Sequence, residues 1–218
     1  MNKIRLLYSK TGNARYISHL DLMATMRRAL LRAGVGLKYS EGFNPHPYIS
    51  VALPLSVGNE SFCELLDFTT NNELLPDGLP ELINPGMPDG LMIREAYVSE
   101  RKFVDISWIR ICCMLDYETN APPEATGILT ELFKAESIVI NKKTKRGLSE
   151  IDIAPFIKQA KFSFSGIVKM NALVSAQNPS VSAEDVKNAI RAAGESQTPD
   201  FLSFTREEIL DKDMAVFR

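Results

Sequence analysis

His19 and His46 are the two histidines of this chain, and both lie within its first fifty residues. An imidazole exchanges a proton near neutral pH, so two histidines can serve as the acid and the base of one reaction. Arginine guanidinium groups bind phosphate oxygens, and Arg15 lies four residues before His19. If the fold brings both imidazoles into one pocket, we expect a site for a phosphate-containing ligand, with His19 and His46 as candidate catalytic residues.

The charge distribution favours the same segment as an anion-binding surface. The formal net charge is -2, from 25 Lys and Arg against 27 Asp and Glu. Residues 1–50 hold eight basic and two acidic residues, whereas residues 51–100 hold one basic and nine acidic residues. A fold that gathers the first segment on one face would attract an anion even though the protein as a whole is acidic.

A helix is predicted after the first strand. Ser18 is a favoured N-cap residue, Asp21 three residues later can form a shortened capping box, and Gly34 can end the helix. His19 would then lie in the first turn, where backbone N–H groups are unpaired and the helix dipole is positive. We expect His19, Asp21 and Glu41 to line the pocket. The alternative is that His19 only helps to cap the helix.

Residues 42–47, Gly-Phe-Asn-Pro-His-Pro, are predicted to form a stiff loop. Its two prolines fix φ, donate no backbone hydrogen bond and hold the residue before each of them extended. Phe43 could stack on a nucleic-acid base, while Asn44, His46 and the nearby Ser40 could bind its edges. The alternative is a rigid connection between two strands.

Further basic residues could contact phosphates. Arg28 and Arg32 lie on the polar face of the predicted helix, and a second cluster in the other half of the chain is expected at a hairpin tip or loop. Short basic runs are also typical of solvated surfaces. The second cluster comprises Lys142, Lys143, Lys145 and Arg146.

The composition is that of a globular protein without a resident metal or cofactor. The chain has 218 residues, 45% of them hydrophobic and 24% charged, and no stretch is apolar enough for a membrane span or a secretory signal. Three cysteines without a CxxC spacing indicate buried free thiols in the cytoplasm. A two-histidine site with Asp21 and Glu41 matches no standard ligand spacing, so no metal is expected.

The predicted elements form the same order twice, strand, helix, two strands, helix and strand. This order predicts an α+β protein with two tandem ferredoxin-like (βαββαβ) units and antiparallel sheets, covering 1–102 and 103–218. Helices are expected at 18–34, 76–83, 122–135 and 183–193. The expected strands are 2–9, one extended piece made of 38–40 and 49–55 around the 42–47 loop, 62–69, 91–100, 105–117, 137–142, 166–174 and 201–206.

Three segments carry a resemblance to a known family. They are 14–23 (Ala-Arg-Tyr-Ile-Ser-His-Leu-Asp-Leu-Met), 39–47 (Tyr-Ser-Glu-Gly-Phe-Asn-Pro-His-Pro) and 54–58 (Pro-Leu-Ser-Val-Gly). The chain resembles the bacterial radical-SAM-linked protein family, a domain of unknown function. The resemblance implies a partner, a radical SAM protein with a cobalamin-binding-like domain. Ala24 and Tyr48 depart from the family pattern, which often has basic residues there.

Three functions follow from the residues and the resemblance together. The first is an accessory RNA-binding protein, without catalytic activity of its own, that works with the radical SAM partner in RNA modification or processing. The second is a metal-independent endoribonuclease that uses His19 and His46, with Arg15 stabilising charge on the phosphate. The third is a protein–protein adaptor without affinity for RNA.

Overall fold

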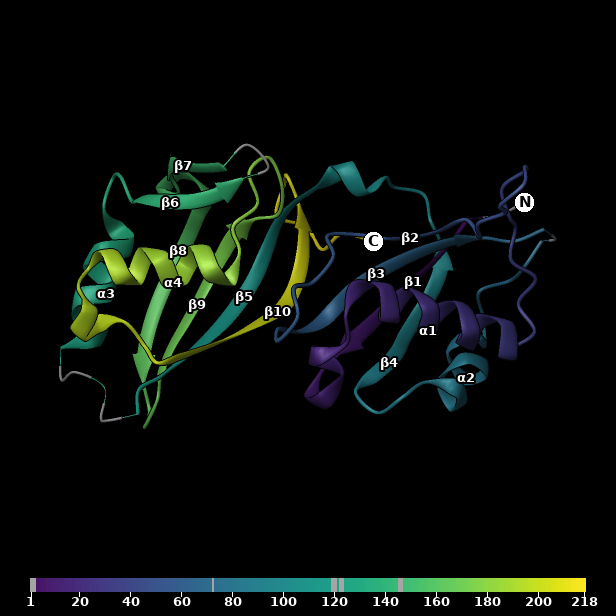
Figure 1. The fold of residues 1–218 in the computed structure, drawn as a ribbon, viewed down its shortest axis with the longest axis horizontal. Coiled ribbons are helices and arrows are strands. Elements are labelled where there is room, and N and C mark those ends of the chain that lie inside the picture. Colours follow the sequence, from purple (N-terminus) through teal and green to yellow (C-terminus); the bar gives the residue numbers. More distant parts are fainter. Residues whose placement is uncertain (1–2, 72, 119–120, 122–123, 145–146) are drawn as a thin grey trace. The chain divides into compact units, whose positions relative to one another are not determined.

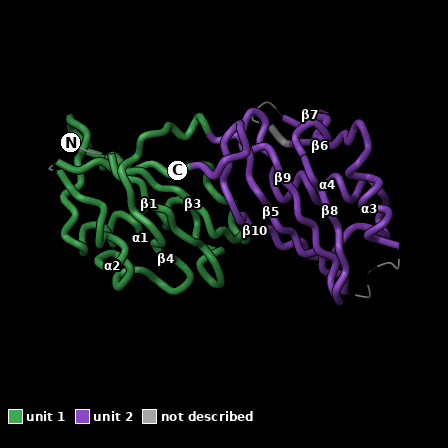
Figure 2. Tube along the Cα trace, turned by 180° about the vertical axis from the view of Figure 1, so that it is seen from behind, with its two compact units in different colours: residues 1–105, 218 green, residues 106–217 purple. Residues whose placement is uncertain are grey.

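The computed structural model describes residues 3–71, 73–118, 121, 124–144 and 147–218 as a mixed α+β protein with antiparallel sheets. Two compact units divide the chain, residues 1–105 with Arg218 (unit 1) and residues 106–217 (unit 2) (Figure 2). The described residues contain four α-helices, and none of these helices is both long and apolar enough to cross a membrane.

Unit 1 is an antiparallel sheet with two helices packed on one face (Figure 1). The strand order is β4-β1-β3-β2. Leu22, Met26 and Leu30 of the first helix pack on Leu6 and Phe68 of the sheet. The elements are β1 (Lys3–Lys10), α1 (His19–Arg32), β2 (Ile49–Val51), β3 (Glu60–Thr69), α2 (Leu79–Ile83) and β4 (Leu91–Val98), with 3-10 turns η1 (Gly12–Tyr16), η2 (Asn84–Gly86) and η3 (Phe103–Asp105).

The predicted helix at 18–34 is confirmed as α1, and its start is the expected one. Ser18 is the N-cap, and its hydroxyl accepts a hydrogen bond from the backbone N–H of Asp21 at 3.2 Å. The strand predicted at 49–55 is shorter than expected, because it ends at Val51. Leu53 has a φ of 45°, which takes the backbone out of the extended region before Pro54.

In unit 2 the antiparallel strand order is β10-β5-β9-β8. In β5, which lies between β10 and β9, the alternate residues Ile109, Ile111, Cys113 and Leu115 are buried. The elements are β5 (Ile106–Asp116), α3 (Ala125–Lys134), β6 (Val139–Thr144), β7 (Gly147–Asp152), β8 (Ile157–Phe164), β9 (Val168–Ser175), α4 (Ala183–Ala192) and β10 (Phe201–Asp211), with 3-10 turns η4 (Ala154–Phe156) and η5 (Glu195–Gln197).

The strand predicted at 137–142 forms, but it does not join the main sheet. Among the residues that the structure describes, β6 pairs with β7 alone, in a separate two-stranded sheet. The strand that follows, β8, takes the edge position beside β9. β8 is not among the predicted strands. Its segment, Ile-Lys-Gln-Ala-Lys-Phe-Ser-Phe, lies at the sheet edge and is mostly exposed, so it lacks the apolar alternation of a half-buried strand.

The three cysteines are free and buried, as the sequence indicated. Burial raises the pKa of the Cys112 and Cys113 thiols above their usual value. The thiolate, which is the reactive form, is therefore disfavoured at both positions.

A buried ion pair lies in the unit 1 sheet, on the face opposite the helices. Arg5 and Asp67 are register partners on β1 and β3, and both side chains are 0% exposed. Nε and Nη2 of Arg5 donate to the two carboxylate oxygens of Asp67 at 2.7 and 2.9 Å. Nη2 also donates to the carbonyl of Arg101 at 2.7 Å, and the guanidinium lies 4.6 Å from the Phe103 ring. The pair thus fixes both the β1–β3 register and the chain segment that crosses this face.

We predict that Asp67→Ala destabilises unit 1 by about 3–5 kcal/mol, because it leaves the Arg5 guanidinium buried without its counter-charge. The measurement is urea unfolding followed by circular dichroism. The double variant Arg5→Met/Asp67→Leu should recover most of the loss, and the exposed control Asp89→Ala should change little. Equal midpoints for Asp67→Ala and the wild type would contradict this role of the pair.

Candidate functional site

The two histidines do not share a pocket, because they lie at opposite ends of β1. His19 begins α1 beside the last residue of β1, where Lys10 Nζ donates to the carbonyl of Ile17 at 2.8 Å. The segment that holds His46 is joined to Thr69, the register partner of Lys3 at the first residue of β1. A strand of eight residues spans roughly 23 Å.

This separation contradicts the expected convergence of His19 and His46. An endoribonuclease needs its acid and its base within reach of one phosphate, so these two histidines do not form such a pair. The physical reason is that α1 leads the chain away from the end of β1 where it began (Figure 1). The sequence spacing of 27 residues gave no information about this direction.

The His46 segment forms a closed loop, residues 40–47, which we call the clamped loop. The backbone N–H of Ser40 donates to the carbonyl of His46 at 2.8 Å, and the backbone N–H of His46 donates to the Ser40 hydroxyl at 3.0 Å. Tyr39 and Pro47 form an antiparallel bridge at its base. Gly42 has a φ of 118°, a conformation that favours glycine.

The base of the clamped loop is joined to the sheet. The backbone N–H of Lys38 donates to the carbonyl of Thr69 at 2.9 Å, and the backbone N–H of Thr69 donates to the carbonyl of Tyr48 at 3.1 Å. The backbone N–H of Tyr48 in turn donates to the carbonyl of Lys38 at 2.9 Å. Both ends of the loop are thus held at the last residue of β3.

The clamped loop displays an aromatic ring in water. Phe43 is fully exposed, at 112% of its reference area, and Asn44 and His46 are also exposed. Tyr39 and Tyr48, on either side of the loop, are 37% and 49% exposed. These two tyrosines are not among the predicted site residues, although their position directly next to the loop is a usable signal in the sequence.

Ser40 and Glu41 have different places in the loop. The Ser40 hydroxyl accepts a hydrogen bond from the His46 main chain, so its observed role is to close the loop. The expected pocket of His19, Asp21 and Glu41 does not form, because Glu41 lies in the clamped loop, at the other end of β1 from His19. The same separation divides the four residues considered as metal ligands, and the part of the chain that the structure describes has no cluster of three or more potential ligands.

Arg28 and Arg32 line a shallow groove of about 580 Å³ between α1 and the turn after α2. Thr25 lies on the same stripe of α1, and residues 85–88 form the opposite wall. Nη2 of Arg32 donates to the Gly86 carbonyl, so this guanidinium is partly committed to the protein. Arg28 is exposed, and the described structure gives it no acidic partner within salt-bridge distance. It is the arginine of the groove that is placed to bind an external anion.

The start of α1 is already occupied by the chain's own groups. The Ser18 hydroxyl lies 2.6 Å from Asp21 Oδ2, and this carboxylate sits in the first turn of the helix. Arg15 Nη1 lies 3.7 Å from Glu60 Oε1, and its guanidinium is 5.0 Å from the Tyr16 ring. The anion site expected from Arg15 and His19 is therefore filled by protein carboxylates.

Lys142 is also committed within the protein. Its ammonium lies 2.6 Å from Asp185 Oδ2 and donates to the Ser180 carbonyl. Asp185 is the N3 residue of the capping box that begins α4, so Lys142 stabilises a helix start. Lys145, Arg146 and the side chain of Lys143 lie outside the described residues.

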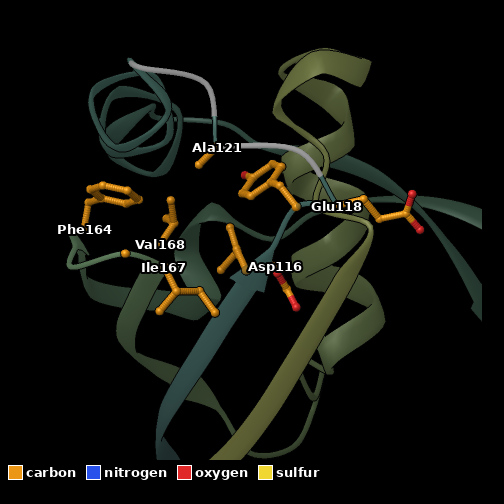
Figure 3. Close-up of a pocket in the computed structure, with 9 residues that line it drawn as sticks. Asp116, Glu118, Ala121, Phe164, Ile167 and Val168 are labelled. Atoms are coloured by element: carbon orange, nitrogen blue, oxygen red, sulfur yellow. The ribbon is translucent and has the colours of Figure 1, made fainter.

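A second hollow, of about 500 Å³, lies in unit 2 beside the end of β5 (Figure 3). The Phe164 ring and Val168 line one side, and Asp116 and Glu118 lie at its rim (Figure 3). The Tyr117 hydroxyl donates to the Gln197 carbonyl at 2.9 Å. The two carboxylates make this hollow unsuitable for a phosphate.

A family of uncharacterized proteins conserved in bacteria, DUF2344, matches residues 3–186. No curated protein matches the chain.

We predict that Ser40→Ala loosens the clamped loop without unfolding unit 1, because one hydrogen bond of about 0.5–1.5 kcal/mol is lost. The measurement is native-state hydrogen exchange at the His46 amide, which should become faster by several-fold. Ser56→Ala, at another exposed serine, is the matched control and should leave this amide unchanged. Unchanged exchange at His46 in Ser40→Ala would show that the hydroxyl does not hold the loop.

Proposed function

We propose that this chain, which belongs to the uncharacterized bacterial family DUF2344, is an accessory RNA-binding protein. In this proposal, the clamped loop stacks on an unpaired base. The observation that supports this most is the full exposure of Phe43 on a loop closed by hydrogen bonds. An exposed Phe forgoes roughly 1.5–3 kcal/mol of burial. Stacking of a base on an aromatic ring contributes about 1–3 kcal/mol.

The neighbouring side chains suit a nucleotide. The Asn44 amide and the His46 imidazole are exposed on the same loop and offer hydrogen-bond donors and acceptors for base edges. Lys38 Nζ lies 5.7 Å from the Tyr48 ring, which places a cation beside a further stacking surface. Because both ends of the loop are fixed, little conformational entropy is lost on binding.

Arg28 and its groove would add a phosphate contact to this site. Arg28 lies in the second half of α1, and residues 33–39 connect the end of this helix to the clamped loop. Arg32 would help to shape the groove through its bond to Gly86. In this proposal Phe43 provides stacking, and Arg28 provides salt-dependent affinity.

We also propose the partner implied by the family resemblance, a radical SAM protein with a cobalamin-binding-like domain, and a shared role in RNA modification or processing. The support is the resemblance of residues 14–23 and 39–47. The chain's own cysteines are buried and have no cluster-binding spacing, which fits the companion rather than the radical enzyme.

We infer that each unit is ferredoxin-like. If the four sheet strands of each unit are numbered 1 to 4 along the chain, their order across the sheet is 4-1-3-2 in both units. Each unit also contains two helices. In unit 2 the β6–β7 hairpin is then an insertion before the second sheet strand. The order of two split βαβ motifs supports this inference.

We predict that Phe43→Ala weakens the binding of a single-stranded RNA 12-mer by about 5- to 100-fold, which corresponds to the loss of one stacked base. The dependence of affinity on salt should stay the same, because no charge is removed. The measurement is fluorescence anisotropy at several salt concentrations. Tyr16→Ala, an exposed aromatic at the other end of β1, is the control and should bind like the wild type.

We predict that Arg28→Gln lowers the slope of log K against log salt by about 0.7, the value for one phosphate contact on a single strand. Arg27→Gln removes the same charge from the neighbouring residue, which is outside the groove, and should leave the slope unchanged. A wild-type protein with no affinity for RNA that still co-purifies with a radical SAM protein would overturn the proposal in favour of a pure adaptor.

A further inference from the structure

One face of the unit 2 sheet is buried, and the other face is partly exposed to solvent. Between the buried residues of β5, the alternate positions Trp108, Arg110 and Met114 point to the other side of the sheet. Met114 is 43% exposed. On this side Trp108 and Arg110 are half-buried, whereas Cys112 and Leu173 are buried, so the face is accessible only in part.

The strand register pairs residues of β8, β9 and β5 across the accessible face. Lys161 of β8 lies opposite Asn171 of β9, which lies opposite Cys112 of β5. Two residues further along β8, Ser163 lies opposite Lys169. Successive cross-strand pairs on one face are about 6.8 Å apart, because two residues separate them along a strand.

Three lysines occupy the β8–β9 side of this face. Lys158 Nζ lies 4.0 Å from the centre of the Trp108 ring, which confirms that both side chains are on one face. Lys158 and Lys161 are exposed, and Lys169 is half-buried beside the Cys112 thiol, where its charge lowers the pKa that burial raises. We call Lys158, Lys161 and Lys169 the lysine row.

The lysine row carries a net positive charge that its own strands do not neutralise. The sequence from residue 153 to residue 183 contains no Asp or Glu. On the β10 side of the face, Arg110 pairs with Glu208 at 3.0 Å, and the Glu207 carboxylate acts on the Cys112 thiol from β10. The positive potential is therefore concentrated along the two strands of the sheet edge.

We propose that the lysine row is a second RNA site, which holds the phosphate backbone of a single-stranded segment. The inference rests on the proposed function for the identity of the ligand as RNA. A row of cations along a flat sheet suits an extended chain of phosphates better than a single ion. Asn171 and Ser163, between the lysines, add hydrogen-bonding groups, and the Trp108 ring adds a stacking surface.

The test is anisotropy with a fluorescein-labelled 20-nucleotide oligouridylate and the full chain. The variant Lys161→Gln/Lys169→Gln should lower the slope of log K against log salt by about 1.4, twice the value for one contact. The control Lys134→Gln/Lys187→Gln removes two charges from α3 and α4 and should keep the wild-type slope. Circular dichroism melting checks that both double variants are folded, and Lys158→Gln gives an independent single-site measurement.

The outcomes separate this inference from the proposed function. If the lysine variants bind like the wild type while Phe43→Ala is weakened, the lysine row is not a site and the clamped loop still is. If the wild type binds no RNA, the proposed function fails and the inference with it. The same comparison is made with a duplex RNA of equal length. If the slope of log K against log salt is then the same for Lys161→Gln/Lys169→Gln and the wild type, the lysine row is specific for a single strand. If the variant lowers the slope as much with the duplex as with the single strand, the proposal of a single-strand site is overturned.

Discussion

The closure of the clamped loop is the constraint on which the proposed site depends. Two hydrogen bonds between Ser40 and His46 hold its ends together, and the bonds of Lys38 and Tyr48 to Thr69 fix its base. Ordering a backbone residue costs about 1–2 kcal/mol, so a loop that is ordered before binding avoids that loss at the moment of contact. Without closure, Phe43 would be one exposed ring on a mobile segment, free to fold back on the protein surface.

That closure depends in turn on the register of β1 and β3. Thr69 is opposite Lys3, and two residues along the same strands Arg5 is opposite Asp67. A slip of this register would place a guanidinium and a carboxylate against apolar neighbours, which is strongly unfavourable. The buried ion pair therefore specifies where β3 ends, and the end of β3 is where the clamped loop is attached.

The sequence predicted the local parts of this arrangement well. Ser18 and Asp21 identified the start of α1, and the α+β class followed from the alternation of element types. The stiff segment between Gly42 and Pro47 is indeed a closed loop. Its closure could not be predicted, because it depends on a side chain, Ser40, that meets the backbone of a residue six positions later.

The sequence-based predictions that were wrong have a common physical cause: tertiary packing sets the direction of the chain in space. His19 and His46 are separated because α1 leads away from the end of β1. Lys142 was expected at a phosphate, and a buried carboxylate that caps α4 holds it instead. β8 was missed because an exposed edge strand with two lysines shows no apolar period, although its charge is the signal that now identifies the lysine row.

Ultraviolet crosslinking of the full chain to single-stranded RNA, with the crosslinked peptides identified by mass spectrometry, tests the central claim most directly. The account predicts a crosslink within residues 40–47, at Phe43 or a neighbouring residue of the clamped loop. Crosslinks confined to the segment from Arg15 to His19, or none in unit 1, would contradict it.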